Sequence, residues 1–80
     1  MTAEFVERRV KELVADQLGL GLEDVRLESA LTGDLGADTL DVLELVMAME
    51  EEFELDIGDN DADRFKTIQD VVDYVSCQIH

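Results

Sequence analysis

Four aspartates in the C-terminal part of the chain have the spacing of a calcium-binding loop. Asp59, Asp61, Asp63 and Asp70 match the first, third, fifth and twelfth positions of the EF-hand pattern, and carboxylate oxygens are ligands that Ca²⁺ prefers. However, Arg64 stands where that loop needs glycine, and an aspartate replaces the final bidentate glutamate. We therefore expect no specific metal site, and only weak divalent-cation binding at the first three aspartates.

Residues that could serve as a nucleophile and its base are scarce. Cys77 is the only cysteine, and the only histidine is His80 at the end of the chain. Neither has a partner nearby in the sequence, so a nucleophile-base pair is not indicated and we expect no enzyme. A single cysteine excludes an internal disulfide and fits a reducing compartment, for which the cytoplasm is the default.

The charge is strongly one-sided. The chain contains 21 Asp and Glu against six Lys and Arg, a formal net charge of −15. Such a field repels nucleic acid and anionic membranes and attracts basic surfaces. Residues 27–63 contain no Lys or Arg at all. This favours an acidic recognition surface for basic partner proteins over a merely solvated face, because mixed signs would stabilise a scaffold helix better.

Periodic apolar residues predict a helix at each end of the chain. The first runs from Thr2 to Leu18, with Thr2 as N-cap and Gly19 as the C-terminal stop. The last begins at Thr67, where Asp70 three residues later completes a box-like cap.

The clearest helix lies in the middle, from Asp38 to Phe53 or Glu54, with Asp38 as N-cap. Its apolar stripe faces the core, whereas Leu43 and Met47 fall on the acidic side. They are either ordinary exposed residues or the apolar centre of a docking patch. The core-facing stripe consists of Val42, Leu45, Val46, Met49 and Phe53.

Farther along the chain, a short helix of one or two turns fits within residues 59–65.

Residues 19–37 form a long loop that is rich in both glycine and leucine. A flexible linker would not carry so many leucines, so we expect an ordered loop whose apolar residues enter the core, with a short helical turn at residues 22–25. Three main helices and a short one, without strand alternation, predict an all-α four-helix bundle, a single domain over residues 1–80 and a monomer. The loop's apolar residues are Leu20, Leu22, Val25, Leu27, Leu31 and Leu35.

Two stretches of this chain together resemble the acyl carrier protein family. Residues 34–41 read DLGADTLD, and residues 44–53 read ELVMAMEEEF. The resemblance extends over about residues 5–79 and includes the acidic segment 56–63. The family's fold is a four-helix bundle with a long loop between the first two helices, as the periodicity also predicts here.

The resemblance implies a carrier of acyl chains, held as thioesters on a 4'-phosphopantetheine arm. The arm is attached at the start of the second helix, where this chain has Thr39. Implied partners are a phosphopantetheinyl transferase and acyl-chain synthases or transferases with basic surfaces, and the pathway stays open between fatty acid, polyketide, peptide and lipid-tail synthesis. We expect docking through Asp38, Asp41, Leu43, Glu44, Met47, Glu50 and Glu51. We expect an acyl pocket lined by Leu45, Met49, Phe53, Ile57, Ala62, Phe65, Val71 and Val75.

The chain departs from the family pattern at two positions. Thr39 replaces the attachment serine, and its extra methyl group crowds the hydroxyl and restricts χ1. Three interpretations are open: Thr39 accepts the arm, the threonine is a substitution that keeps the chain unmodified, or this is a carrier-like interaction protein that never bears an arm. Gly58 stands where the family often has proline, which predicts a more mobile third helix.

Overall fold

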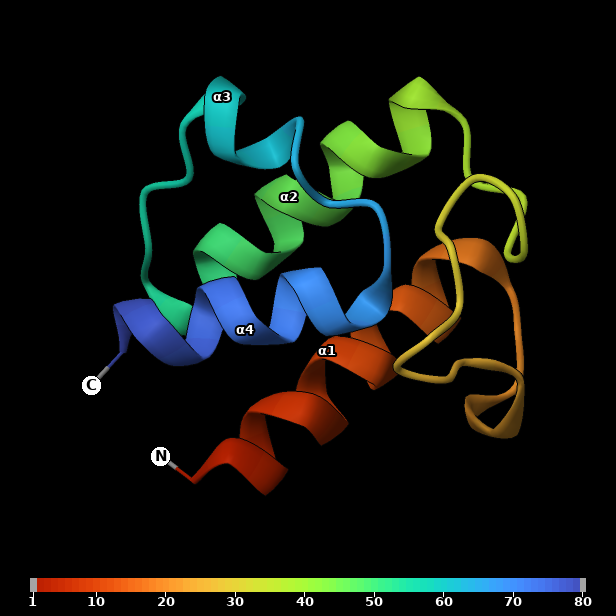
Figure 1. Ribbon diagram of the computed structural model, residues 1–80, viewed down its shortest axis with the longest axis horizontal. Helices are drawn as coiled ribbons and strands as arrows, with labels where there is room; N and C mark the ends of the chain where they lie inside the picture. Colours follow the sequence, from red (N-terminus) through yellow and green to blue (C-terminus); the bar gives the residue numbers. More distant parts are fainter. Residues whose placement is uncertain (1, 80) are drawn as a thin grey trace.

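The computed structural model describes residues 2–79, which form a helical bundle (Figure 1). Its elements are α1 (Ala3–Leu18), the 3₁₀ turn η1 (Leu22–Asp24), α2 (Thr39–Phe53), α3 (Asp59–Ala62) and α4 (Ile68–Gln78). The predicted all-α fold is confirmed. Within the described residues, no helix is long and apolar enough to cross a membrane. His80, the only histidine, lies outside them.

The start of each long helix is set by a side-chain cap. The Thr2 hydroxyl accepts a hydrogen bond from the Phe5 amide at 3.1 Å. Reciprocal capping boxes pair Asp38 with Asp41 at α2 and Thr67 with Asp70 at α4. These caps satisfy amides that have no partner inside their helix, so each helix begins where its cap stands. The predicted helix starts are confirmed. At the other end of α1, Gly19 takes the left-handed conformation with φ of 69°.

The core lies where the apolar faces of α1, α2 and α4 meet. The loop residues Val25 and Leu31 are fully buried in it, as predicted, and Leu20, Leu27 and Leu35 pack against it. Leu22 is a correction, because its side chain is 42% exposed. It lies in η1, whose three residues are all exposed to solvent, so the turn presents the leucine outward. The buried helix positions are Val6, Val10, Val14, Ala15, Leu45, Val46, Met49, Phe53, Ile68, Val71, Val72 and Val75.

The long loop is held by backbone hydrogen bonds to the start of α4. The amide of Leu31 donates to the Lys66 carbonyl at 2.9 Å, and the amides of Ile68 and Gln69 donate to Ser29 and Leu27. These bonds are of strand type, and Ala30 and Thr67 form an isolated antiparallel bridge. In Figure 1 the loop runs down one end of the molecule, between the end of α1 and the start of α2. The loop is therefore an ordered part of the bundle.

A forked ion pair ties α1 to α2. The Arg9 guanidinium donates to both carboxylate oxygens of Glu52, at 3.0 and 2.8 Å, and to Glu12 at 2.6 Å. The hydrogen bond to Glu52, with a smaller contribution from Glu12, raises the pKa of Arg9 above its ordinary value. The same bond lowers the pKa of Glu52 below its ordinary value of 4.5. Arg9 of α1 thus neutralises part of the negative charge of α2. The sequence of α2 alone gives no sign of this pairing.

We predict that Arg9→Gln lowers the free energy of unfolding by about 0.5 kcal/mol at neutral pH, a small value because the pair is partly solvated. The melting temperature should fall by roughly 2–4 °C in a domain of this size. Because the folded-state pKa of Glu52 is depressed, the pair stabilises the fold above the ordinary glutamate pKa, and this stabilisation is lost as the pH falls through the folded value. The gap between the two proteins should therefore close on acidification.

Arg8→Gln is the matched control for this measurement. Its guanidinium is largely exposed and contacts Glu12 only at 3.8 Å. Thermal unfolding followed by circular dichroism across a pH series measures both variants. A gap for Arg9→Gln that is equal at neutral and acid pH, or is matched by Arg8→Gln, would show that the pair does not stabilise the fold.

Candidate functional site

Thr39 is the first residue of α2 and is exposed to solvent. The capping function at this helix start belongs to its neighbour, since the Asp38 carboxylate accepts from the Asp41 amide at 2.8 Å. Among the described residues, the Thr39 hydroxyl forms no hydrogen bond, so it is free for other chemistry. It stands at the positive end of the helix dipole, beside amides that lack helical partners, and both features favour a bound phosphate group.

A groove of about 340 Å³ opens beside Thr39. One wall comes from the first turns of α2 and the other from the segment that follows α3. Hydroxyl, apolar and cationic side chains therefore meet in one place, together with the carboxylate of Asp63, and the first three kinds suit a long arm with a phosphate at one end. The groove is lined by Thr32, Thr39, Val42, Leu43, Ala62, Asp63, Phe65 and Lys66.

Apolar side chains form a stripe on the exposed face of α2. Leu43 is 50% and Met47 64% exposed. Leu40 is 61% exposed and belongs to the same stripe, although the sequence analysis did not include it. Its spacing of three and seven residues from the other two was the signal that could have identified it. Three large apolar side chains in one exposed row are typical of the centre of a docking patch.

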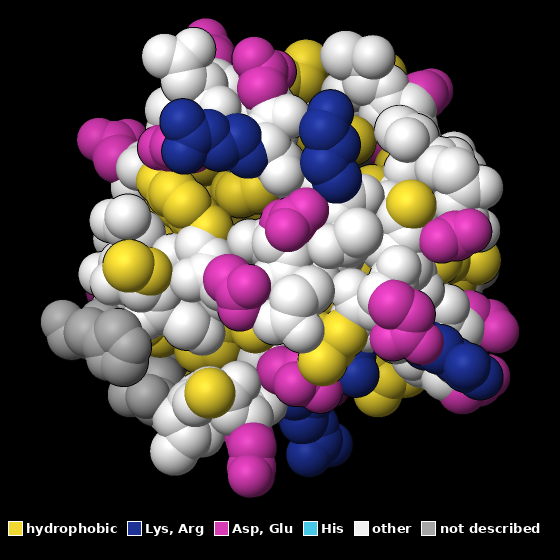
Figure 2. Space-filling model, in the orientation of Figure 1, with side chains coloured by type: hydrophobic (Ala, Val, Ile, Leu, Met, Phe, Trp, Pro, Cys, Tyr) yellow, Lys and Arg dark blue, Asp and Glu magenta, His cyan; other side chains and the backbone are white. Residues whose placement is uncertain are grey.

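The acidic residues predicted for docking differ in how free they are. Glu44 and Glu51 are exposed, and Glu44 also accepts a hydrogen bond from Gln17 of α1. Asp41 is half-buried and occupied in the capping box. Glu50 is also half-buried, and its carboxylate accepts from the amide of Ile57 at 2.9 Å. In Figure 2 acidic side chains are spread over the visible face, whereas basic ones reach the surface in only a few places.

The residues predicted to line an acyl pocket do come together. Seven of the eight are buried in one cluster, and Ala62 is half-buried at its edge. Ala62 and Phe65 also line the groove beside Thr39. These two residues therefore lie both at the groove beside Thr39 and at the apolar interior.

Helix α3 is held to α4 by Tyr74. Its hydroxyl donates to the Asp61 carboxylate at 3.1 Å, and its ring meets Phe65 edge-on with the centroids 5.4 Å apart. Partial burial, and then the bond to Asp61, raise the pKa of Tyr74. Asp70 is meanwhile engaged in its own cap. Over residues 2–79 no three potential metal ligands are grouped, so the aspartates with EF-hand spacing are not gathered into a site.

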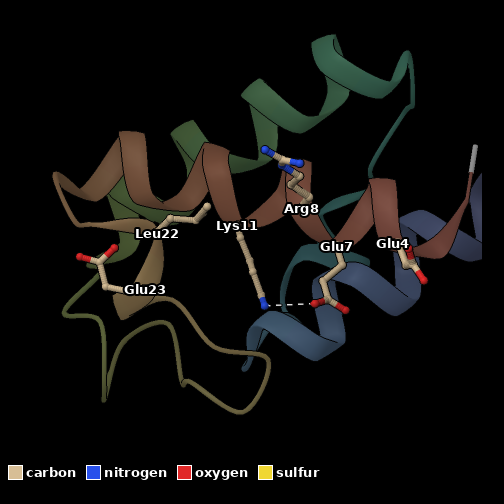
Figure 3. Close-up of a pocket in the computed structure, with 6 residues that line it drawn as sticks. All are labelled: Glu4, Glu7, Arg8, Lys11, Leu22 and Glu23. Carbon is tan, nitrogen blue, oxygen red and sulfur yellow. Dashed lines mark hydrogen bonds and ion pairs between the residues drawn. The ribbon is translucent and has the colours of Figure 1, made fainter.

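A second hollow, of about 490 Å³, lies between α1 and η1 (Figure 3). Lys11 and Glu7 face one another across one turn of α1 at 3.1 Å, and Leu22 approaches from η1. The charged residues that line this hollow are of both signs, and none of the residues around Thr39 is among them. Its lining is Glu4, Glu7, Arg8, Lys11, Leu22 and Glu23.

The comparison with known families agrees with this geometry. Residues 8–75 match the family model described as a phosphopantetheine attachment site, PP-binding. The matched range begins in α1, ends in α4, and includes Thr39 and the groove. The free hydroxyl, the helix N-terminus and the groove together fit the group that this family bears. The chain belongs to the PP-binding family of phosphopantetheine attachment domains.

Proposed function

We propose that this protein is an acyl carrier protein whose arm is attached to Thr39. The observation that carries the proposal is the free, exposed Thr39 hydroxyl at the start of α2, inside the range that matches the family. When bound, 4'-phosphopantetheine supplies a terminal thiol that holds acyl groups as thioesters. The chain itself is a carrier, and other enzymes do the chemistry.

Attachment requires only what this position offers. Thr39 Oγ1 forms a bond to the phosphorus of coenzyme A that bears the pantetheine. The P–O bond from this phosphorus to adenosine 3',5'-bisphosphate breaks, and the hydroxyl proton passes to a base that the transferase supplies. The threonine methyl restricts χ1 and slows the approach. Exposure of Thr39 to solvent supports the proposal, because a transferase can reach the residue.

The core beside the groove is suited to shelter an acyl chain. Met49 is fully buried at its centre, and methionine is flexible enough to repack around an apolar guest. Ala62 at the groove edge is small, and α3 around it has only four residues. Ala62 and Phe65 would therefore form the entrance, and the other predicted pocket residues would form the walls.

Docking of partner enzymes is proposed to use the apolar stripe of α2 with its acidic rim. Leu40, Leu43 and Met47 supply desolvated contact, and Glu44 and Glu51 supply attraction to basic surfaces. Asp41 and Glu50 act mainly within this chain, as caps for backbone amides. Asp38 contributes both its cap and its exposed charge.

An unmodified interaction protein is the second candidate, and the threonine at the attachment position is the observation that favours it. In that case the same stripe and rim bind a basic partner, and no arm takes part. The two candidates differ in the mass that they predict for the chain after it has met a phosphopantetheinyl transferase.

We predict that the chain gains the mass of one phosphopantetheine when incubated with coenzyme A, Mg²⁺ and a broad-specificity phosphopantetheinyl transferase. Intact mass spectrometry detects the gain, and peptide mapping should place it at Thr39. Thr39→Ser should load faster because its primary hydroxyl is less crowded. Thr39→Val keeps the shape but removes the nucleophile, and should gain nothing.

Full loading of Thr39→Ser with no gain on the parent chain would contradict attachment to Thr39 and favour the unmodified interaction protein. Failure of both chains to load, with folding verified by circular dichroism, would contradict the carrier function as a whole.

We further predict that Leu43→Gln, made in the Thr39→Ser chain, raises the KM of loading by about tenfold, the effect of truncating an interface anchor worth ~1.4 kcal/mol. Initial loading rates at several carrier concentrations measure this change. Leu22→Gln is the matched control, because the same substitution is made at a similarly exposed leucine on η1. Equal KM values for the two variants would contradict docking through the α2 stripe.

A further inference from the structure

Lys66 is the one cationic side chain that lines the groove beside Thr39, among the described residues. Its backbone is fixed on both sides. The Lys66 amide donates to the Arg64 carbonyl at 2.9 Å and to the Asp70 carboxylate at 3.2 Å, and its carbonyl accepts from Leu31. The side chain therefore extends into the groove from a rigid base.

Leu31, which is buried, also positions the start of α2. The Leu31 amide bonds to Lys66, and the Leu31 carbonyl accepts from the Ala37 amide at 2.9 Å. Ala37 is buried and lies two residues before Thr39. Leu31 thus links the two walls of the groove through two backbone hydrogen bonds. The backbone of Lys66 and the start of α2 are therefore held in a fixed relation by the fold.

The ammonium group of Lys66 has no anionic partner in the described part of the chain. Lys11, the only other lysine, pairs with Glu7 at 3.1 Å. By contrast, none of the carboxylates described lies within ion-pair distance of Lys66, although Asp63 lines the same groove. Three cations, Arg26, Arg64 and Lys66, form no ion pair among the described residues, and of these only Lys66 lines the groove beside Thr39. It remains available to an anion that enters the groove.

We propose that Lys66 binds the phosphodiester of the arm that Thr39 bears, an inference that rests on the proposed function. The Lys66 ammonium and the amides at the start of α2 would both donate hydrogen bonds to the phosphate. The neighbouring apolar groove then receives the following part of the arm. Lys66 is a positioning residue: it keeps the arm against the groove until a partner with a basic surface competes for the phosphate.

The test uses the fact that the chain has two lysines. The Thr39→Ser chain, labelled with ¹³C at lysine Cε, is compared before and after loading with phosphopantetheine. We expect the Lys66 signal to shift and broaden on loading, and the Lys11 signal to stay unchanged. The Lys66 shift should shrink at high salt, because screening weakens the ion pair.

Phosphorus NMR of the loaded chain gives a second readout. Lys66→Gln should move and narrow the phosphodiester signal, since the phosphate loses its partner. Arg64→Gln is the matched control, because this exposed cation lines a different hollow beside Asp61 and Tyr74. Amide spectra of each variant verify the fold.

The outcomes separate the two proposals. A loaded chain in which the Lys66 carbon does not respond, or in which Lys66→Gln and Arg64→Gln leave the same phosphorus signal, overturns the role of Lys66 alone. Failure of the serine chain to load overturns the proposed function, and the role of Lys66 with it.

Discussion

Buried loop backbone must find hydrogen-bond partners, and in this chain the partners of residues 27–37 lie at the start of α4 and within the loop itself. Leu31 is the centre of this arrangement, because its side chain is buried in the core while its amide and carbonyl reach two different segments. These hydrogen bonds hold the start of α2 and the start of α4 in a fixed position relative to one another. The position of Thr39, the groove and the backbone of Lys66 all depend on these bonds.

The acidic residues do more than supply charge. Several accept hydrogen bonds from backbone amides, as Asp38 and Asp41 do at α2 and Asp70 does at α4. Glu52 pairs with Arg9, which removes part of the repulsion within α2. The net charge of −15 is therefore carried by a fold that uses many of its acids internally. Of the acids that remain exposed, Glu44 and Glu51 lie on α2 with the apolar stripe, and others are spread over the rest of the surface.

The candidate site combines a rigid part with an adaptable part. The start of α2 is fixed by its capping box and by the backbone bonds through Leu31. The opposite wall includes Lys66, whose backbone is bonded to Leu31, and the end of α3, a four-residue helix linked to α4 by the hydrogen bond from Tyr74 to Asp61. A fixed start of α2 beside the short helix α3 would allow an apolar chain to enter the core and leave it again, as the proposed function requires.

The helices, their caps and most of the core could be predicted from the order of the residues. Caps and apolar stripes depend on residues within four positions of one another, as Thr67 with Asp70 or Val6 with Val10 and Val14, so they can be identified without the fold. The match of the central motif also indicated the attachment position at Thr39. Only the tertiary structure decided which distant groups meet. Arg9 reaches Glu52 across 43 positions, Leu22 turns to solvent, and Lys66 lies beside Thr39 through the bonds of Leu31. These relations are set by how the helices and the loop pack, which no local pattern contains.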